Sequence, residues 1–275
     1  MRVLHVDLGR EMRGGQCQVL SLIDELRAHA VDQTLLGPFG EPFSIPRLRA
    51  SCDLVHAHCA KSHTLAALFA RAPLVVSRRV AFPIKRGLLS RWKYSRPVLF
   101  LAVSNYVAGK LMEAGVPSRK IEVVYDGVRA LPPSTRTGPL IAPASNDPMK
   151  GSDLIRQSGL DVKFSTNLIE DLKTARGLVY ITREEGLGSA ALLAMSAGVP
   201  VLASRVGGLP EIVRHEETGL LTANDPAAIA AAAPRLLAPE SAHWAEKGRE
   251  LVHSRFLASH MAAATLACYR RLTVQ

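Results

Sequence analysis

The feature that most constrains this 275-residue chain is the stretch over residues 182–221, TREEGLGSAALLAMSAGVPVLASRVGGLPEIVRHEETGLL. An acidic pair and a glycine turn precede an apolar helix there, and a short apolar strand and a second glycine turn follow it. Gly186 and Gly188 allow the backbone to bend closely around a ligand. The helix that begins near Leu187 directs unpaired N–H groups and a partial positive charge at the turn. The stretch predicts an anion-binding pocket with Glu185 at its mouth, or else an ordinary helix-to-strand unit of an α/β core.

The positive charge of the chain is concentrated in its N-terminal half. The formal net charge is +10, and residues 54–112 contain ten basic side chains and no acidic one. Such a segment predicts a positive field toward phosphates, nucleic acid or anionic lipid. Basic and apolar residues interleave there as they do at a membrane surface, or at the side that receives an acceptor; these residues are Arg78, Arg79, Lys85, Arg86, Arg91, Trp92 and Lys93. A solvated basic face is the alternative, while no recognition-module signature supports nucleic acid.

The composition is that of a globular protein large enough for two small domains. Hydrophobic residues make up 48% of the chain, which suffices for a sizeable core. The four cysteines have neither the pairing of a zinc knuckle nor the spacing of a disulfide framework, which favours a reducing cytoplasm. The first residues, MRVLHVDLGR, predict a strand and not a signal sequence. No apolar run is long enough for a membrane span, so we expect a soluble protein, at most peripheral on the inner face of the cytoplasmic membrane.

The order of the predicted elements is that of two doubly wound α/β domains. A strand at residues 3–6, a glycine turn and a helix over residues 17–28 open the chain as such domains open. The G-x-G-x-x-G fingerprint of dinucleotide-binding enzymes is missing. Residues 130–139 are rich in Pro, Ser and Thr without apolar periodicity and predict a linker. We therefore assign residues 1–129 to an N-terminal domain and residues 140–255 to a C-terminal domain.

Several ordered sequence blocks give the chain a family resemblance. EGLG, an Ala-Met in the helix, AGVPVLAS and GGLPEIV resemble the donor-sugar region of retaining glycosyltransferases of family 4 (glycosyl transferases group 1), which have the GT-B fold. MRVLHVDLGREMRGGQCQVL, DLVHAHCAKSH and MKGSDLI resemble further blocks, so the resemblance covers nearly the whole chain. It implies two Rossmann-like domains facing a central cleft, and a final helix over residues 256–275 that packs back on the first domain. It also implies a nucleotide-sugar donor, a saccharide or lipid-linked acceptor, and a place in envelope polysaccharide or lipopolysaccharide assembly.

Transfer from a nucleotide sugar develops negative charge on a diphosphate and oxocarbenium character on the sugar, and the protein must stabilise both. The resemblance implies that Lys150 neutralises the diphosphate, that Glu185 binds hydroxyls of the donor sugar, and that His58 contacts the transferring sugar. Gly14 and Gly15 are expected to bring N–H groups to the same phosphates, or to form a plain turn. The remaining donor-binding residues are expected to be Gly186, Leu187, Gly188 and Leu193. No metal and no other cofactor is implied.

Two histidines alternate along one predicted strand. His56 and His58 therefore face the same side of the sheet near its C-terminal end, where doubly wound sheets bind ligands. The resemblance assigns His58 to the sugar and leaves a structural role for His56. Metal binding by this pair with Cys59 and His63 lacks a carboxylate partner and is the weaker interpretation.

Two positions depart from the family pattern. The family has a second acid eight residues after Glu185, which grips the nucleotide ribose; this chain has Leu193, which cannot accept those hydrogen bonds. The family's arginine five or six residues before Lys150 is replaced by Ser145 or Ala144, and we expect the basic N-terminal segment to compensate. Two alternatives therefore stay open: a non-catalytic GT-B protein that binds nucleotide sugars, and a nucleotide-sugar 2-epimerase, for which the N-terminal half offers few acid/base carboxylates.

Overall fold

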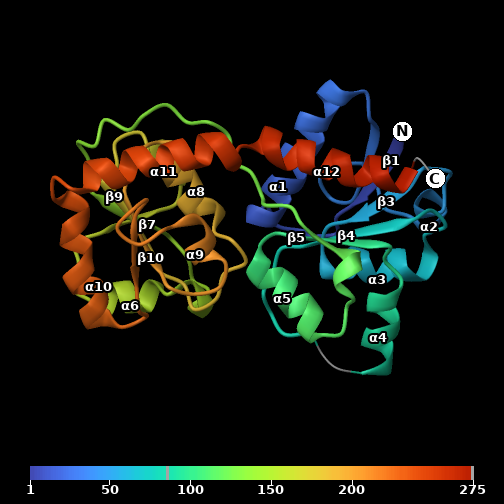
Figure 1. Cartoon of the computed structure of the whole chain (residues 1–275), viewed down its shortest axis with the longest axis horizontal. Helices are drawn as coiled ribbons and strands as arrows, with labels where there is room; N and C mark the ends of the chain where they lie inside the picture. The colour runs from blue at the N-terminus through green and yellow to red at the C-terminus, as the bar shows by residue number, and fades with distance from the viewer. Residues whose placement is uncertain (85–86, 274–275) are drawn as a thin grey trace. The chain divides into compact units, whose positions relative to one another are not determined.

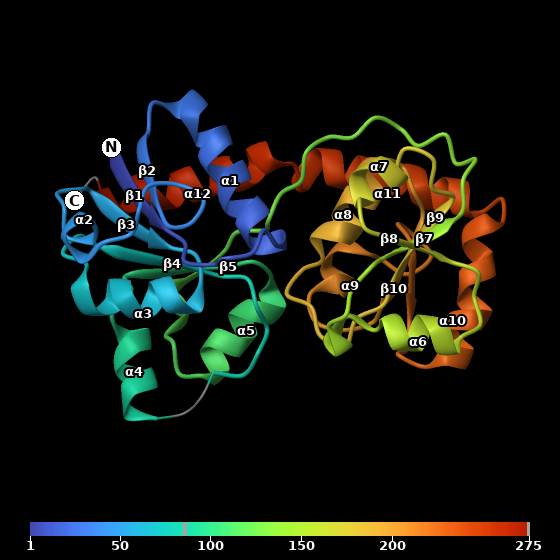
Figure 2. The same cartoon turned by 180° about the vertical axis from the view of Figure 1, so that it is seen from behind.

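The chain folds into two compact units of parallel β-sheet flanked by helices (Figure 1, Figure 2). The structure is a computed structural model and describes residues 1–84 and 87–273. Unit 1 comprises Met1–Gly127 and Ala258–Gln275, and unit 2 comprises Val128–Leu257. The α/β class and the two doubly wound sheets expected from the sequence are confirmed.

The sheet of unit 1 has six parallel strands in the order β2-β1-β3-β4-β5-β6. These strands are β1 (Arg2–Val6), β2 (Asp32–Leu36), β3 (Leu54–Ala57), β4 (Leu74–Arg78), β5 (Leu99–Ala102) and β6 (Ile121–Val123). Most of their residues are buried, because helices cover both faces of a doubly wound sheet. Pairing of β1 with β3 out of sequence order sets His5 directly beside His56.

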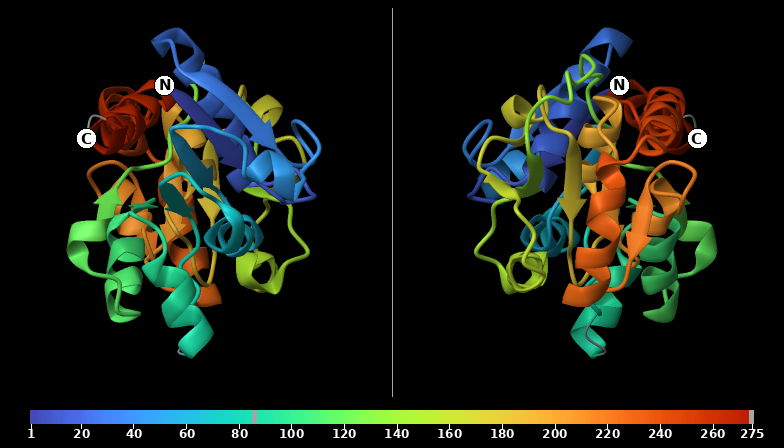
Figure 3. Two further views of the ribbon diagram at one scale, coloured as in Figure 1. Left: turned by 90° about the vertical axis from the view of Figure 1, so that its right-hand side faces the viewer. Right: turned by 90° about the vertical axis from the view of Figure 1, so that its left-hand side faces the viewer.

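The helices of unit 1 come from its two separate segments of chain. They are α1 (Gly14–Leu26), α2 (Ile45–Leu48), α3 (Ala60–Phe69), α4 (Leu88–Ser95), α5 (Asn105–Glu113) and α12 (Ala258–Thr273), with 3₁₀ turns η1 (Arg27–His29) and η2 (Ser118–Lys120). Leu22 and Leu26 of α1 and Met261 and Leu266 of α12 share one hydrophobic core with the sheet. The C-terminal helix α12 therefore packs beside α1 on one face of unit 1 (Figure 1). In contrast, α4 stands out from the body of unit 1 and buries none of its residues (Figure 3).

The sheet of unit 2 has five parallel strands in the order β11-β10-β9-β7-β8. Its strands are β7 (Leu140–Pro143), β8 (Lys163–Ser165), β9 (Gly177–Tyr180), β10 (Val201–Ser204) and β11 (Leu220–Thr222). Its helices are η3 (Pro148–Lys150), α6 (Ser152–Gln157), α7 (Leu168–Asp171), α8 (Ser189–Ser196), α9 (Leu209–Ile212), α10 (Pro226–Ala232), η4 (Ala233–Leu237) and α11 (Ser241–Arg255). Residues 130–139 contain no helix or strand and lie along unit 2, where Ser134 N donates to Ala197 O at 2.8 Å.

Both sheets have a point at which the strand order reverses. In unit 1 it lies between β1 and β3, and in unit 2 between β7 and β9. The connections on either side of such a point leave toward opposite faces, so a crevice opens at the carboxyl ends of the strands, and ligands bind there. Each unit therefore has one edge at which functional side chains are expected. Among the helices of the described ranges, none is long and apolar enough to cross a bilayer.

Candidate functional site

The loops that follow β7 and β9 meet at the strand-order reversal of unit 2. Arg183 N donates to Met149 O at 2.8 Å, and the Thr182 hydroxyl donates to the same carbonyl at 3.0 Å. Gly151 adopts a φ of +62°, and a Cβ there would lie 2.8 Å from Ile181 O. Glycine is therefore required after Lys150 for the first loop to approach the end of β9 this closely.

This approach brings Lys150 and Glu185 together. Lys150 Nζ lies 2.9 Å from Glu185 Oε2, and the Tyr180 hydroxyl donates to the same oxygen at 2.6 Å. Gly186 N donates to Oε1 at 3.1 Å. Burial, and secondly the Glu185 carboxylate, raise the pKa of Tyr180 well above its usual value, so the phenol stays a donor. The carboxylate is thus held in one orientation at the edge of the sheet, 15% exposed, beside a lysine that is 40% exposed.

A second glycine loop supports the backbone of Glu185. Gly207 has a φ of +57°, and a Cβ there would lie 2.0 Å from Glu185 O; a Cβ on Gly208 would lie 2.1 Å from Gly186 O. Gly208 N also donates to Glu185 O at 3.1 Å. These two glycines were not among the predicted site residues, although the block GGLPEIV contains them. The signal was a glycine pair directly before a proline-containing helix start.

Helix α8 begins at Ser189, two residues later than expected, because Gly188 still has a positive φ. The side chain of Leu187 is 3% exposed, so only its backbone can face a ligand. Leu193 is half-buried, whereas its neighbours Leu192 and Ala194 are fully buried. Leu193 therefore lies on the side of α8 that faces away from the core of unit 2.

Three histidines meet at the strand-order reversal of unit 1. His58 Nε2 lies 2.9 Å from His5 Nδ1, and the ring centroids of His56 and His58 are 3.9 Å apart, as their alternate positions require. The other ring nitrogen of His58 lies 3.3 Å from Arg79 Nη1. His56 lies between the Tyr269 hydroxyl at 2.5 Å and the Ser77 hydroxyl at 2.8 Å. His58, expected to contact a sugar, thus has both ring nitrogens bonded within the protein.

Burial keeps these three imidazoles neutral. Loss of hydration lowers the pKa of His5 to about 4 and holds the pKa values of His56 and His58 well below their usual range. Sequence reasoning missed His5 because its place beside His58 depends on the pairing of β1 with β3.

The same three histidines are the one group in the described part of the chain whose ligand atoms are close enough for a metal, all within 4.8 Å of one another. The hydrogen bonds of these histidines are incompatible with a bound metal ion. A metal-bound His58 would carry a proton on the nitrogen that faces Arg79, and two donors would then meet. The other metal site considered, His56 and His58 with Cys59 and His63, does not form among the described residues. The Cys59 sulfur caps α3, and His63 donates to Lys93 O at 3.2 Å.

The remaining candidates of unit 1 lie at three places. Gly14 and Gly15 are the first residues of α1, which therefore begins three residues before the predicted start at residue 17 and not after a glycine turn; a Cβ on Gly15 would meet open space. Arg78 Nη1 lies 3.4 Å from the Tyr94 hydroxyl, and its Nη2 donates to Phe82 O at 2.6 Å. Helix α4 carries Arg91, Trp92 and Lys93. Lys85 and Arg86 lie outside the described residues.

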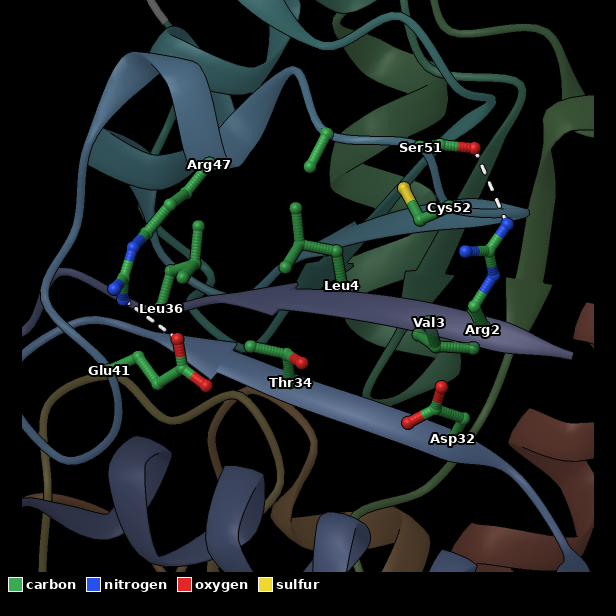
Figure 4. Close-up of a pocket in the computed structure, with 11 residues that line it drawn as sticks. Arg2, Val3, Leu4, Asp32, Thr34, Leu36, Glu41, Arg47, Ser51 and Cys52 are labelled. Carbon is green, nitrogen blue, oxygen red and sulfur yellow. Dashed lines mark hydrogen bonds and ion pairs between the residues drawn. The ribbon is translucent and has the colours of Figure 1, made fainter.

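A separate pocket lies over β1 and along the length of β2, from Asp32 to Leu36 (Figure 4). Two of its arginines have partners within the lining: Arg47 pairs with Glu41 at 2.7 Å, and Arg2 donates to the Ser51 hydroxyl at 3.4 Å. The lining is completed by Val3, Leu4, Asp32, Thr34, Leu36, Ala50 and Cys52. None of the candidate residues from the sequence lines it.

Comparisons with known proteins give two family matches. The family described as Glycosyl transferases group 1 matches residues 150–239, and Glycosyltransferase Family 4 matches residues 25–130. The chain is 36% identical over 93 residues to N-acetyl-alpha-D-glucosaminyl L-malate synthase of Bacillus anthracis, over 33% of this chain and 24% of that protein. It is 38% identical over 113 residues to alpha-maltose-1-phosphate synthase of Mycolicibacterium smegmatis, over 38% of this chain and 29% of that protein. The chain thus spans less than a third of either relative's length.

Solved structures share the whole fold. HepE of Anabaena, in complex with UDP and glucose, superposes with a TM-score of 0.82 at 15% identity over 98% of this chain and 100% of that chain. Sucrose-phosphate synthase of Thermosynechococcus elongatus gives 0.82 at 17% identity over 99% of both chains. The lipopolysaccharide outer core galactosyltransferase WaaB gives 0.74 at 14% identity over 98% of this chain and 100% of that chain. The GT-B fold expected from the sequence is confirmed.

The close contact of Gly207 with Glu185 predicts a large cost for a methyl group at this position. Gly207→Ala should lower the free energy of unfolding by about 3 kcal/mol, because the Glu185 backbone must move and the positive φ is strained. Gly159→Ala is the matched control: its φ is +71° but nothing lies within 4 Å, so only backbone strain of about 1 kcal/mol is expected. Urea unfolding of both variants measures the difference, and equal losses would contradict the close contact.

Proposed function

We propose that this chain, which belongs to the group 1 (family 4) glycosyltransferases, transfers a sugar from a nucleotide-sugar donor to a saccharide or lipid-linked acceptor with retention of configuration. The observation that carries the proposal is the pairing of Lys150 with Glu185 at the carboxyl edge of unit 2, next to the N-terminus of α8. It joins a cation for a diphosphate to an oriented acceptor of hydroxyl hydrogen bonds.

A nucleoside diphosphate suits this edge for electrostatic reasons. The N-terminus of α8 adds a partial positive charge to that of Lys150, and both stabilise the charge that develops on the leaving diphosphate. The structure of HepE with UDP-glucose supports a donor of this class, and makes UDP-sugars the first to test. The protein cation and N–H groups perform the charge neutralisation, so the proposal needs no metal.

The two side chains would take different parts in the transfer. Lys150 bonds to Glu185 through one of three ammonium donors and is 40% exposed, so it can turn toward phosphate oxygens. Glu185 would keep its bonds from Tyr180 and Gly186 N while its remaining lone pairs accept from sugar hydroxyls. The sugar is then fixed while the departing phosphate assists attack by the acceptor on the same face, which retains the configuration.

Leu193 is the observation that favours a second function, binding of a nucleotide sugar without transfer. The side chain is half-buried and lies away from the core of unit 2, yet it cannot accept hydrogen bonds from a ribose. Ribose hydroxyls left without a partner there would cost about 1–3 kcal/mol. Donor affinity, rather than folding, is the property that this residue would reduce.

The surface of α4 supports an acceptor at a membrane. Leu88 and Leu89 are 85% and 84% exposed, and Trp92 is 42% exposed, with Arg91 between them. Apolar side chains flanked by cations insert into the boundary of an anionic bilayer. We therefore propose a cytoplasmic protein, peripheral on the membrane, with a lipid-linked acceptor used in lipopolysaccharide or another envelope polysaccharide.

Substitution of the two adjacent acids tests the site. Glu185→Gln should lower the rate of donor hydrolysis, measured as UDP release from UDP-glucose, by about 10- to 100-fold, because an amide replaces a charge-assisted acceptor. Glu184→Gln is the control, since the Glu184 side chain has no partner among residues 1–84 and 87–273. The assignment is wrong if both variants keep the wild-type rate or lose the same factor.

Restoring an acid on α8 separates the two functions. Leu193→Glu should tighten UDP binding about 10-fold in calorimetry, because the carboxylate supplies the missing ribose acceptor about one turn into α8. Leu193→Lys, a polar control without an acceptor, should not tighten it. A glutamate that leaves UDP affinity unchanged in a folded protein would mean that the nucleoside does not lie beside this residue.

Vesicle binding tests the α4 surface. The chain should sediment with phosphatidylglycerol-containing vesicles and release as salt rises, since 0.1 M salt screens charge over about 10 Å. The double variant Leu88→Ser, Leu89→Ser should weaken binding more than tenfold, because each exposed leucine contributes about 1.5–3 kcal/mol on burial. Leu68→Ser on α3, 52% exposed, is the control. Equal sedimentation of wild type and double variant would leave α4 as a solvated face.

A further inference from the structure

The buried histidines of unit 1 form a hydrogen-bond chain whose direction can be read from its ends. Arg79 can only donate, so His58 Nδ1, at 3.3 Å from Arg79 Nη1, must accept. His58 then carries its proton on Nε2 and donates to His5 Nδ1 at 2.9 Å. His5 in turn donates from Nε2 to Gln33 Oε1 at 3.1 Å. The Gln33 amide is fixed in that orientation because its Nε2 donates to Ile23 O at 3.1 Å.

His58 and His5 are buried, Gln33 is partly buried, and each ring nitrogen of the two histidines has a partner, which fixes the guanidinium at the end of the chain. Arg79 donates from Nε to Asp126 Oδ1 at 2.9 Å and from Nη1 to His58, and the Arg79 and Asp126 side chains are both 12% exposed. Within the described ranges no residue accepts a hydrogen bond from Arg79 Nη2, and this atom is not buried. One edge of the guanidinium is thus clamped and the other reaches solvent.

The free edge of the Arg79 guanidinium lies at the carboxyl ends of the strands of unit 1, where doubly wound sheets bind ligands. Arg79 follows β4, His58 follows β3 and Asp126 follows β6, so all three lie at the carboxyl ends of their strands. Helices α3 and α5 begin at the same edge, after β3 and β5, and their N-termini add partial positive charge.

The local charge also favours an anion. Asp126 is the carboxylate paired with Arg79, while Arg78 bonds to the Tyr94 hydroxyl and the Phe82 carbonyl, which are neutral acceptors. No acidic residue occurs in positions 54–112. Among the described residues, Arg79 thus has one carboxylate partner, Asp126, and Arg78 has none.

We propose that the free edge of Arg79 binds a phosphate group of a substrate in unit 1, and that His58 and His5 are positioning residues that hold the guanidinium for it. A planar guanidinium with donors on Nη1 and Nη2 matches two oxygens of a phosphate. The proposal rests on the proposed glycosyl transfer and specifies a phosphate-bearing substrate for it. His58 acts through Arg79 here, and not through a bond of its own to the sugar.

The positioning role can be separated from a structural one by choice of substitution. In His58→Asn the amide oxygen lies near the place of Nδ1 and can still accept from Arg79, whereas His58→Leu fills space but accepts nothing. Both remove the ring, so both carry a comparable packing cost. The affinity for an anion should therefore depend on whether residue 58 can accept a hydrogen bond from Arg79, and not on the stability of the variant.

The experiment uses the full chain labelled with ¹⁵N-arginine. The Nε–H resonance of Arg79, assigned by its loss in Arg79→Lys, is followed as inorganic phosphate is added. We expect a saturable shift, retained within about threefold affinity in His58→Asn and weakened at least tenfold in His58→Leu. Arg119→Lys, exposed on η2 and outside both candidate sites, should leave the titration unchanged.

A second titration with UDP shows which phosphate the site takes and tests the proposed function separately. If saturating UDP leaves the phosphate shift of Arg79 intact, the site belongs to the acceptor; if UDP abolishes it, the site belongs to the donor diphosphate. Phosphate that does not move the Arg79 resonance, while UDP binds elsewhere, overturns this inference and leaves glycosyl transfer standing. Wild-type phosphate affinity in His58→Leu, or stoichiometric zinc in the purified chain, also overturns it.

Discussion

The out-of-sequence pairing of parallel strands is the constraint on which both candidate sites depend. Because β9 pairs with β7 and not with β8, the loops carrying Lys150 and Glu185 emerge side by side at one edge. The same constraint sets β1 beside β3 in unit 1, where His5 meets His58. Side chains far apart in sequence thus become neighbours because the strands that precede them are paired in the sheet.

The two edges stabilise charge by different means. In unit 2 the Glu185 carboxylate is partly exposed and surrounded by donors, among them a lysine free to turn. In unit 1 the imidazoles are fully buried, which favours their neutral form and makes each both donor and acceptor. A fully satisfied neutral network of this kind is rigid, so it can orient the Arg79 cation at the edge of the sheet. The edge of unit 2 is suited to a ligand that replaces Glu185 as the partner of Lys150. The edge of unit 1 is suited to a ligand that binds Arg79, which is already held in place.

The features that could be predicted from the sequence are those that depend on local patterns of residues. Buried apolar strands, glycine turns and short connections indicated two doubly wound sheets, and residues 3–6 were placed within β1, Arg2–Val6. Alternation also predicted that His56 and His58 share a face. The start of α8 was wrong by two residues, since Gly188 continues the turn. The contacts of His5 and Gly207 could not be predicted, because each depends on which distant backbone segment lies beside it.

Hydrogen exchange can test whether a nucleotide sugar binds at the carboxyl edge of unit 2. The ligand is whichever of UDP-, GDP- or ADP-glucose stabilises the chain most against heat. We expect slower exchange for backbone amides of residues 186–192, at the turn and first residues of α8, when that ligand is bound. Thermal stabilisation with unchanged exchange in these residues, and protection elsewhere, would contradict it.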